Sequence, residues 1–458
     1  MPNYSHHGAV MPAVVRSERV VLPEGERPAT IHVRDGRIAA IGEYTRVPAG
    51  VMVVEAGSLV VLPGLVDTHV HVNEPGRTEW EGFATATRAA AAGGVTTIVD
   101  MPLNSVPATT SVAAFERKLG AAQGQCHVDV GFWGGVVPGN ASDLEPLARA
   151  GVLGFKAFLS PSGVEEFAHV AEPELREALP VLARLGVPLL VHAELPSALR
   201  PIDPAADPRA YGTWLNSRPP ASEAAAVELL IRLSREYGTA IHIVHLASAD
   251  ALPALRAARA GRVRITAETC PHYLTFCADD VQDGRTDFKC APPIRDSGHQ
   301  ALLWQALVSG DIDLIATDHS PAPPALKHLL DGDFTRAWGG IASLQLGLAA
   351  VWTGAASRGV SVSQLSRWLS TAPAALAGLS RWKGAIAVGR DADLILWDPD
   401  AHMTVEPAAL EHRHPVTPYA GLRLRGRVHR TLLRGELIYD EGRFLTPPRG
   451  RAVLQTTA

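Results

Sequence analysis

Eight short apolar runs alternate with alanine- and leucine-rich stretches of helical period between about residue 60 and residue 380. This alternation is typical of repeated β-α units around a parallel sheet, and so of an α/β protein. Eight such units in one span are the number that closes a (β/α)8 barrel of the TIM type. The predicted strands are residues 64–71, 94–102, 127–134, 152–158, 187–194, 240–248, 263–269 and 311–320. The helices expected between them include residues 82–94, 111–123, 222–238 and 248–261.

The two ends of the chain follow a different pattern. Residues 12–60 and about 384–446 alternate polar and apolar side chains and carry D-G, R-G and E-G turns typical of hairpins. Neither end is large enough for a comfortable core alone, so we expect both to form one small β-sandwich domain with the barrel inserted between them. The predicted limits are residues 1–60 for the N-terminal half, 61–380 for the barrel, and 381–458 for the C-terminal half and tail.

Composition limits the partners that this chain can take. It is 47% hydrophobic and 19% charged, with a formal net charge of −5 and no block of like charges. We therefore expect no nucleic-acid or membrane partner, and a small neutral or weakly polar ligand fits better.

The four cysteines, Cys126, Cys270, Cys277 and Cys290, form no C-x-x-C pair and are too few to crosslink a chain of this size. We expect buried thiols in a reducing compartment. The first twenty residues contain no basic region that leads into an apolar stretch, and no run of about 18 apolar residues follows. These features predict a cytoplasmic protein.

Five of the predicted strands end in residues that can bind a metal ion or be modified to do so. On the first strand, His69 and His71 share one face because alternate residues of a strand point the same way. In a (β/α)8 barrel the carboxyl ends of all strands converge on one site. We therefore predict a metal site there. Its candidate ligands are His69, His71, Lys156, His192, His245 and Asp318.

Each candidate taken singly has a structural alternative. A lone H-x-H pair is more often solvent-facing or satisfied by other hydrogen bonds, Lys156 could extend to the barrel rim, and Asp318 could cap the next helix. An ammonium group cannot bind a metal, but burial lowers the pKa of a lysine, and a neutral amine can be modified or act as a nucleophile. The metal prediction therefore depends on the conjunction of five strand ends.

Strand alternation also sorts the neighbouring residues. His242 is an odd number of positions from His245 and is expected on the opposite face, so it is left out of the ligand set. Glu194 is expected to share the face of His192. His319 is expected to point away from the site.

Long ordered motifs resemble those of the cyclic amidohydrolases, a group in the amidohydrolase superfamily that includes dihydroorotases, dihydropyrimidinases (hydantoinases) and allantoinases. The likeness covers nearly the whole chain and is strongest to the allantoinases. The motifs include "VDTHVHVNEPGRTEWEGF", "GVLGFKAF", "HIVHLASADAL", "ETCPHYL", "KCAPPIRD" and "ATDHSPAPP".

This resemblance implies a pair of divalent ions inside a barrel that is joined to a β-sandwich, and a homotetramer. It implies that His69, His71 and Asp318 bind one ion and that His192 and His245 bind the other. Lys156, carboxylated by CO₂ to N6-carboxylysine, would bridge them as a carbamate. Imidazole and carboxylate ligands suit zinc, our first expectation, and also cobalt, iron, manganese and nickel.

The substrate class follows from three departures from the dihydroorotase pattern. Dihydroorotases hold a substrate carboxylate with an arginine after H-x-H, an asparagine in K-x-N-P-P and a histidine in D-H-x-P-H. Here these places are Asn73, Ala291 and Ala322, which favours a neutral ring. Dihydropyrimidinases usually supply a tyrosine from the loop after the third strand, and residues 131–140 contain none.

The expected reaction is hydrolysis of the cyclic amide of allantoin to allantoate, a step of purine catabolism, by a metal-activated hydroxide. We expect Asp318 to accept the proton of the hydroxide and to deliver it to the departing ring nitrogen. Asn73, Asn104 and Ser320 are candidate donors and acceptors for the substrate, although each could instead bond to its own backbone. The alternatives are a hydantoinase or dihydropyrimidinase, a dihydroorotase, a non-catalytic assembly protein of the same fold, and a Schiff-base enzyme that uses Lys156.

Overall fold

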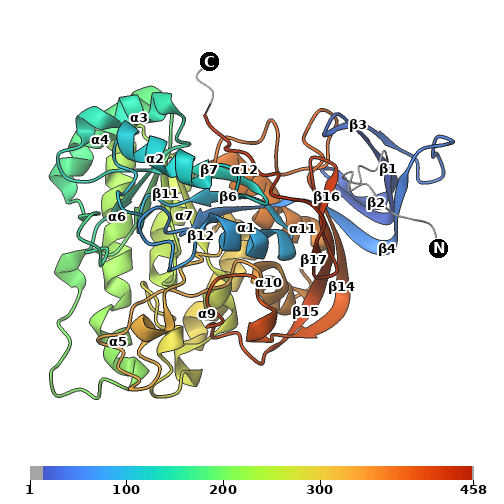
Figure 1. Ribbon diagram of the computed structural model, residues 1–458. Coiled ribbons are helices and arrows are strands. Elements are labelled where there is room, and N and C mark those ends of the chain that lie inside the picture. Colours follow the sequence, from blue (N-terminus) through green and yellow to red (C-terminus); the bar gives the residue numbers. More distant parts are fainter. Residues whose placement is uncertain (1–13, 456–458) are drawn as a thin grey trace.

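The computed structural model describes residues 14–455, in which a barrel lies beside a large sheet (Figure 1). The first thirteen residues, on which part of the cytoplasmic prediction rests, and the last three of the expected tail lie outside the described residues. In the described part of the chain, no helix has the length and apolar character needed to cross a membrane.

Parallel strands form the barrel, and they match the eight predicted runs, the third of which contains β7 and the start of the two-residue strand β8. Within residues 14–455 they pair in two sheets, β5-β6-β7 and β8 to β13 in order. The backbone N–H of Leu153 donates to the carbonyl of Phe132, which joins β7 to β9, and the N–H of His71 donates to the carbonyl of His319 at 2.8 Å, which closes the ring. The fold class is therefore as predicted. The bounds are β5 Leu65–Val70, β6 Val95–Asp100, β7 Asp129–Phe132, β8 Gly134–Gly135, β9 Phe155–Phe158, β10 Leu189–His192, β11 Ile241–Ile243, β12 Ile265–Thr269 and β13 Leu314–Ile315.

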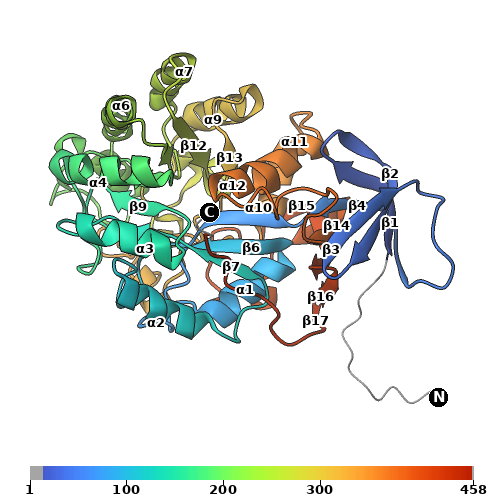
Figure 2. The ribbon, with the colours of Figure 1, turned by 90° about the horizontal axis from the view of Figure 1, so that it is seen from above.

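Amphipathic helices surround the strands, as the view from above shows (Figure 2). Their ends carry the expected signals: the side chain of Ser111 caps α2 by accepting from the N–H of Ala114, and α6 ends at Gly238 in the left-handed conformation. The bounds are α1 Phe83–Ala92, α2 Val112–Ala122, α3 Leu144–Ala150, α4 Glu172–Leu185, α5 Tyr211–Ser217, α6 Pro220–Tyr237, α7 Leu252–Ala260, α8 Pro271–Thr275, α9 Ser297–Ser309, α10 Gly347–Ala356, α11 Val362–Ser366 and α12 Ala372–Leu376.

The two ends of the chain share one sheet. Over the described residues its order is β17-β16-β15-β14-β4-β1-β2-β3, so that β4 from the N-terminal segment pairs with β14 from the C-terminal segment. A separate apolar core under this sheet includes Val15, Ile31 and Leu432. The exact domain limits stay a prediction. The bounds are β1 Val14–Leu22, β2 Gly25–Arg34, β3 Arg37–Gly42, β4 Val53–Pro63, β14 Leu394–Thr404, β15 Arg423–Leu433, β16 Glu436–Asp440 and β17 Arg443–Phe444.

Gly64 alone separates β4 of this sheet from β5 of the barrel. A Cβ at Gly64 would lie 2.1 Å from Oγ1 of Thr96, so any side chain there would collide with β6. The first barrel strand is therefore a direct continuation of the strand that joins the two ends of the chain.

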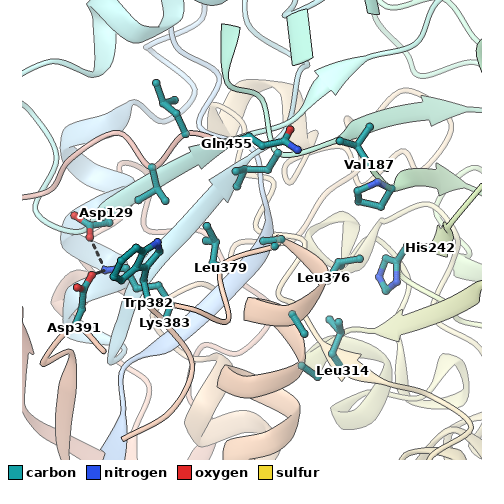
Figure 3. A pocket seen from close by; sticks show the side chains of 18 of the residues that line it. Asp129, Val187, His242, Leu314, Leu376, Leu379, Trp382, Lys383, Asp391 and Gln455 are labelled. Atoms are coloured by element: carbon teal, nitrogen blue, oxygen red, sulfur yellow. Dashed lines mark hydrogen bonds and ion pairs between the residues drawn. The ribbon is translucent and has the colours of Figure 1, made fainter. Parts of the chain in front are cut away.

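A cavity of about 1100 Å³ lies at the amino ends of the barrel strands (Figure 3). At its edge the ammonium of Lys383 lies 2.6 Å from Oδ2 of Asp129, 2.9 Å from Oδ2 of Asp391 and 2.7 Å from Oδ2 of Asp393. The lysine thus fills the centre of this acidic cluster and ties β7 to the C-terminal segment. Because barrel enzymes work at the carboxyl ends of their strands, we assign this end of the barrel to stability.

The described part of the predicted tail is anchored to the barrel. Its backbone brackets β7, since the N–H of Val130 donates to the carbonyl of Arg451 and the N–H of Val453 donates to the carbonyl of Val130, at 2.9 and 2.8 Å. The segment has little regular structure, as expected, but it lies against the barrel. It lines the cavity at the amino ends of the strands, which we call the basal cavity.

Candidate active site

The carboxylate of Asp318 lies between His69 of β5 and His71, which directly follows this strand. Its Oδ1 atom is 3.1 Å from Nε2 of His69 and 3.3 Å from Nε2 of His71, and all three side chains are buried. Burial raises the pKa of Asp318, but His69 and His71 outweigh burial and hold that pKa well below its usual range. The three residues together place an ionised carboxylate and two ring nitrogens within reach of one cation.

His192 and His245 lie directly beside this group. The Nδ1 atom of His192 is 3.0 Å from Nε2 of His245, and the ring centroids of His245 and His69 are 5.4 Å apart. Burial, followed by the neighbouring positive groups, lowers the pKa of both His192 and His245 well below the usual value. Neutral imidazoles keep a lone pair for a metal ion, so the predicted convergence of distant strand ends produces a suitable donor set.

Lys156 extends from β9 into the same region and is fully buried. Its Nζ atom has no hydrogen-bond partner among the described residues and lies 4.8 Å from the ring centroid of Phe158. Burial lowers the pKa of Lys156 to about 7, although Asp318 and Glu268 favour the charged form. An unpaired buried amine in a polar site indicates a missing partner group.

The backbone at two of the candidate ligands is strained. His245 has φ 40° and Asp318 has φ 46°, in the left-handed region that residues other than glycine rarely adopt. Such strain persists only where the surrounding structure imposes it, and it gathers at functional sites.

Sequence reasoning missed Glu268, which lies on β12 and is completely buried. Its Oε1 atom is 2.6 Å from Nδ1 of His69, and its Oε2 atom is 3.0 Å from Nε2 of His242. His242 does face away from the site, as predicted, and Figure 3 shows it beside the basal cavity. It still reaches His69 through Glu268, which fixes a proton on Nδ1 of His69 and leaves Nε2 free to bind a metal.

The other residues sorted by strand alternation lie as expected. Glu194 accepts from Nε2 of His192 at 2.7 Å and forms an ion pair with Arg218. The Nδ1 atom of His319 accepts from the backbone N–H of Ser343, so this ring is turned away from the candidate ligands.

A cavity of about 270 Å³ opens onto the candidate ligands at the carboxyl ends of the strands. Asn104 and Ser320 line it, but Asn73 does not. The Oδ1 atom of Asn73 instead accepts from Nδ2 of Asn104 at 3.0 Å, and the Asn73 side chain is completely buried. The remaining lining residues include His69, His71, His192, His245, Asp318, Phe158, Trp214, Arg218, Lys289, Ala291 and Trp338.

Comparison with known proteins agrees with this geometry. The model of the amidohydrolase family matches residues 60–438, and the chain belongs to this family. It is 52% identical to an allantoinase of Streptomyces avermitilis over 96% of this chain and 97% of that protein, and 43% identical to an allantoinase of Arabidopsis thaliana over 97% and 91%. The structure of an L-hydantoinase (dihydropyrimidinase) from Arthrobacter aurescens is 30% identical, with a TM-score of 0.92, and covers 97% of this chain and 100% of its own.

Proposed function

We propose that this protein hydrolyses the cyclic amide bond of allantoin to give allantoate, in purine catabolism. One observation carries the proposal: five of the six candidate ligands line a single cavity, with Lys156 buried beside them, in a chain that is 52% identical to an allantoinase. The similarity to allantoinases indicates which reaction to expect, and the buried donor set supplies groups that can perform it.

We propose that His69, His71 and Asp318 hold one divalent ion and that His192 and His245 hold a second. The donors fit such ions because the imidazoles of His192 and His245 are kept neutral and the carboxylate of Asp318 is kept ionised. Zinc is our first expectation, and cobalt, iron, manganese and nickel suit the same donors. When bound, divalent ions of this kind lower the pKa of water from about 15.7 to about 7 and polarise a carbonyl oxygen.

Lys156 would supply the group between the two ions. Its neutral Nζ attacks the carbon of CO₂, a nitrogen–carbon bond forms while one carbon–oxygen π bond opens onto oxygen, and the nitrogen releases one proton to water, which leaves a carbamate of charge −1. Two observations support this: Nζ has no partner in the described structure, and burial keeps its pKa at about 7, so that the reactive neutral amine is abundant near neutral pH. The resulting N6-carboxylysine offers two oxygen ligands.

We assign the proton transfer to Asp318. This carboxylate lines the cavity and stays ionised, so it can accept a proton from the attacking nucleophile and then deliver it to the departing ring nitrogen. Because the same oxygen faces Nε2 of His69 and Nε2 of His71, its position is fixed before substrate binds.

Two of the substrate contacts that we propose are neutral groups, an amide and a hydroxyl. Asn104 and Ser320 line the cavity and can pair with the carbonyl and N–H groups of the ring. Asn73 acts behind them by holding Asn104. The cavity also contains Ala291 where dihydroorotases carry a carboxylate-binding asparagine, which supports a neutral substrate.

Turnover of four rings by one preparation tests the proposal. Protein loaded with zinc and bicarbonate is assayed with allantoin, hydantoin, dihydrouracil and dihydroorotate, and we expect the highest kcat/KM with allantoin. A higher value with hydantoin or dihydrouracil would assign the chain to the hydantoinases. No turnover of any ring would favour a non-catalytic assembly protein, and trapping by borohydride without metal dependence would favour Schiff-base chemistry through Lys156.

We further propose that the chain forms a homotetramer and works in the cytoplasm. Light scattering after size-exclusion chromatography measures the first, and cell fractionation measures the second.

A further inference from the structure

A second buried lysine, Lys289, lines the cavity. Its side chain is 5% exposed, and its Nζ atom donates to the carbonyl of Ala337 at 2.6 Å and lies 4.2 Å from the ring centroid of Trp214. Within residues 14–455, no carboxylate lies within the 4.0 Å of an ion pair with this ammonium. Lys289 is thus a cation at the cavity wall without an anionic partner in the described structure.

The other cation of the wall is already neutralised. Arg218 forms an ion pair with Glu194, which in turn bonds to His192. An ammonium has three N–H donors, and the carbonyl of Ala337 uses one of them. Lys289 therefore has donors left for an oxygen atom of a ligand.

The backbone places Lys289 beside Ser320 on this wall. The N–H of Gly340 donates to the carbonyl of Lys289 at 2.8 Å, and the N–H of Ser320 donates to the carbonyl of Ile341 at 3.0 Å. Ser320 follows Asp318 by two residues. The charged groups around the two lysines differ: Arg218, Lys327 and Asp333 surround Lys289, whereas Asp318 and Glu268 surround Lys156.

We propose that Lys289 favours allantoin over the unsubstituted hydantoin ring by donating a hydrogen bond to the carbonyl oxygen of the ureido arm. This inference rests on the proposed function. The ring of allantoin has to reach Asp318 to be opened, so the arm is the part that extends along the wall. A lysine offers donors only, which suits the arm's carbonyl.

The Lys289→Met variant is assayed with allantoin and with hydantoin, which has the same ring without the ureido arm. Comparison of the two substrates isolates the contribution of the arm to binding. With Lys289→Met we expect kcat/KM for allantoin to fall by about 10- to 100-fold, the range of a lost hydrogen bond to a charged donor, chiefly through KM. The value for hydantoin should stay within about twofold, since it makes no such bond. If hydantoin turns over too slowly to measure, its inhibition constant against allantoin takes the place of kcat/KM.

Lys327 provides the matched control. It is buried, donates to the carbonyls of Trp338 and Gly340 in the same 337–340 segment, and does not line the cavity. If Lys289 acts only by holding this segment, Lys327→Met and Lys289→Met will each lower kcat/KM for allantoin and for hydantoin by the same factor. That result would show that the specificity proposal is wrong. Lys289→Arg, which keeps the charge, should recover part of the preference for allantoin.

The melting temperature of each variant and the activity of the wild-type protein distinguish a folding failure, a wrong inference and a wrong proposed function. If Lys289→Met does not fold, as judged by its melting temperature, Lys289→Gln replaces it and should lower the allantoin-to-hydantoin ratio in the same direction. An unchanged ratio in every folded variant overturns the inference. Failure of the proposed function is visible in the wild-type protein, which would then not hydrolyse allantoin at all.

Discussion

The Nδ1 atom of His69 lies 2.6 Å from Oε1 of Glu268, although 199 positions separate the two residues in the sequence. A carboxylate in this place orients the imidazole and raises its basicity toward a metal. We predict that Glu268→Gln weakens metal affinity by about 10- to 100-fold. Competition with a chelator, followed by elemental analysis, measures this loss directly.

Thr266→Val is the control for Glu268→Gln, because it is a milder change in the same chain of hydrogen bonds. The hydroxyl of Thr266 lies 2.8 Å from Nδ1 of His242 and is two hydrogen bonds further from His69 than Glu268 is, so its removal should weaken metal binding much less. Wild-type affinity in Glu268→Gln would show that Glu268 has no part in orienting the ligand.

Formation of the carbamate should depend on pH through Lys156. Burial lowers the pKa of Lys156 to about 7, so the neutral amine predominates above this pH and becomes scarce below it. When stripped protein is reactivated at a constant concentration of dissolved CO₂, we expect the rate to fall about tenfold per unit below pH 7 and to level off above it. The rate of carbamate formation is measured as the recovery of activity after zinc is added.

Lys156→Ala should show no response to bicarbonate and should lose metal. A variant that kept two ions and the full rate would eliminate the bridging carbamate. Equal reactivation rates at about pH 6 and pH 7 would contradict the role of the free amine.

Asp318→Asn should abolish turnover while both metal ions are largely retained. The amide keeps an oxygen ligand but cannot accept the proton, and general acid–base groups contribute at least about 100-fold to the rate. Metal content per chain and kcat are measured on the same sample. Ser320→Ala, a change in the same wall, should affect KM more than kcat, and full activity in Asp318→Asn would defeat the proposed role of the aspartate.

Stability should depend on a buried ion pair behind His71. The ammonium of Lys118 lies 2.6 Å from Oδ2 of Asp100, whose other oxygen accepts from the N–H of Val72. Lys118→Met leaves an uncompensated buried carboxylate and should lower the free energy of unfolding by about 3–5 kcal/mol. Denaturant titration measures the loss.

The control for this prediction is an exposed pair of the same chemistry. Arg149 and Glu145 lie 2.5 Å apart on the surface of α3, so Arg149→Met should change stability by less than about 1 kcal/mol. Equal losses in the two variants would mean that burial of the Lys118 pair is unimportant.

The strands and the candidate ligands were predictable because both follow short-range periodicity. Eight apolar runs mark the barrel, and the carboxyl ends of parallel strands must meet, so residues as distant as His69 and His245 could be placed together. The fold class also followed, because the two hairpin-rich ends lacked a core of their own.

The periodicity of the sequence could not predict which side chains bond to one another across the barrel. The bonds of Glu268 to His69 and His242 join three different strands, and nothing in the spacing of "ITAET" indicates them. Asn73 shows a second limit: it lies beyond the end of β5 with φ 66°, and its side chain accepts a hydrogen bond from Asn104 and does not line the cavity. Lys289 lies in a loop, where position along the chain predicts no direction at all.

The passage from β4 through Gly64 into β5 also sets an order for assembly. His69 lies on β5 and His71 directly follows it, whereas the preceding strand β4 pairs with β14, and the ribosome makes β14 only after every barrel strand is complete. Until that late segment docks, β4 lacks its antiparallel partner, and such long-range pairing forms slowly. The strand that runs directly into the first ligand pair therefore reaches its full pairing only in the finished polypeptide.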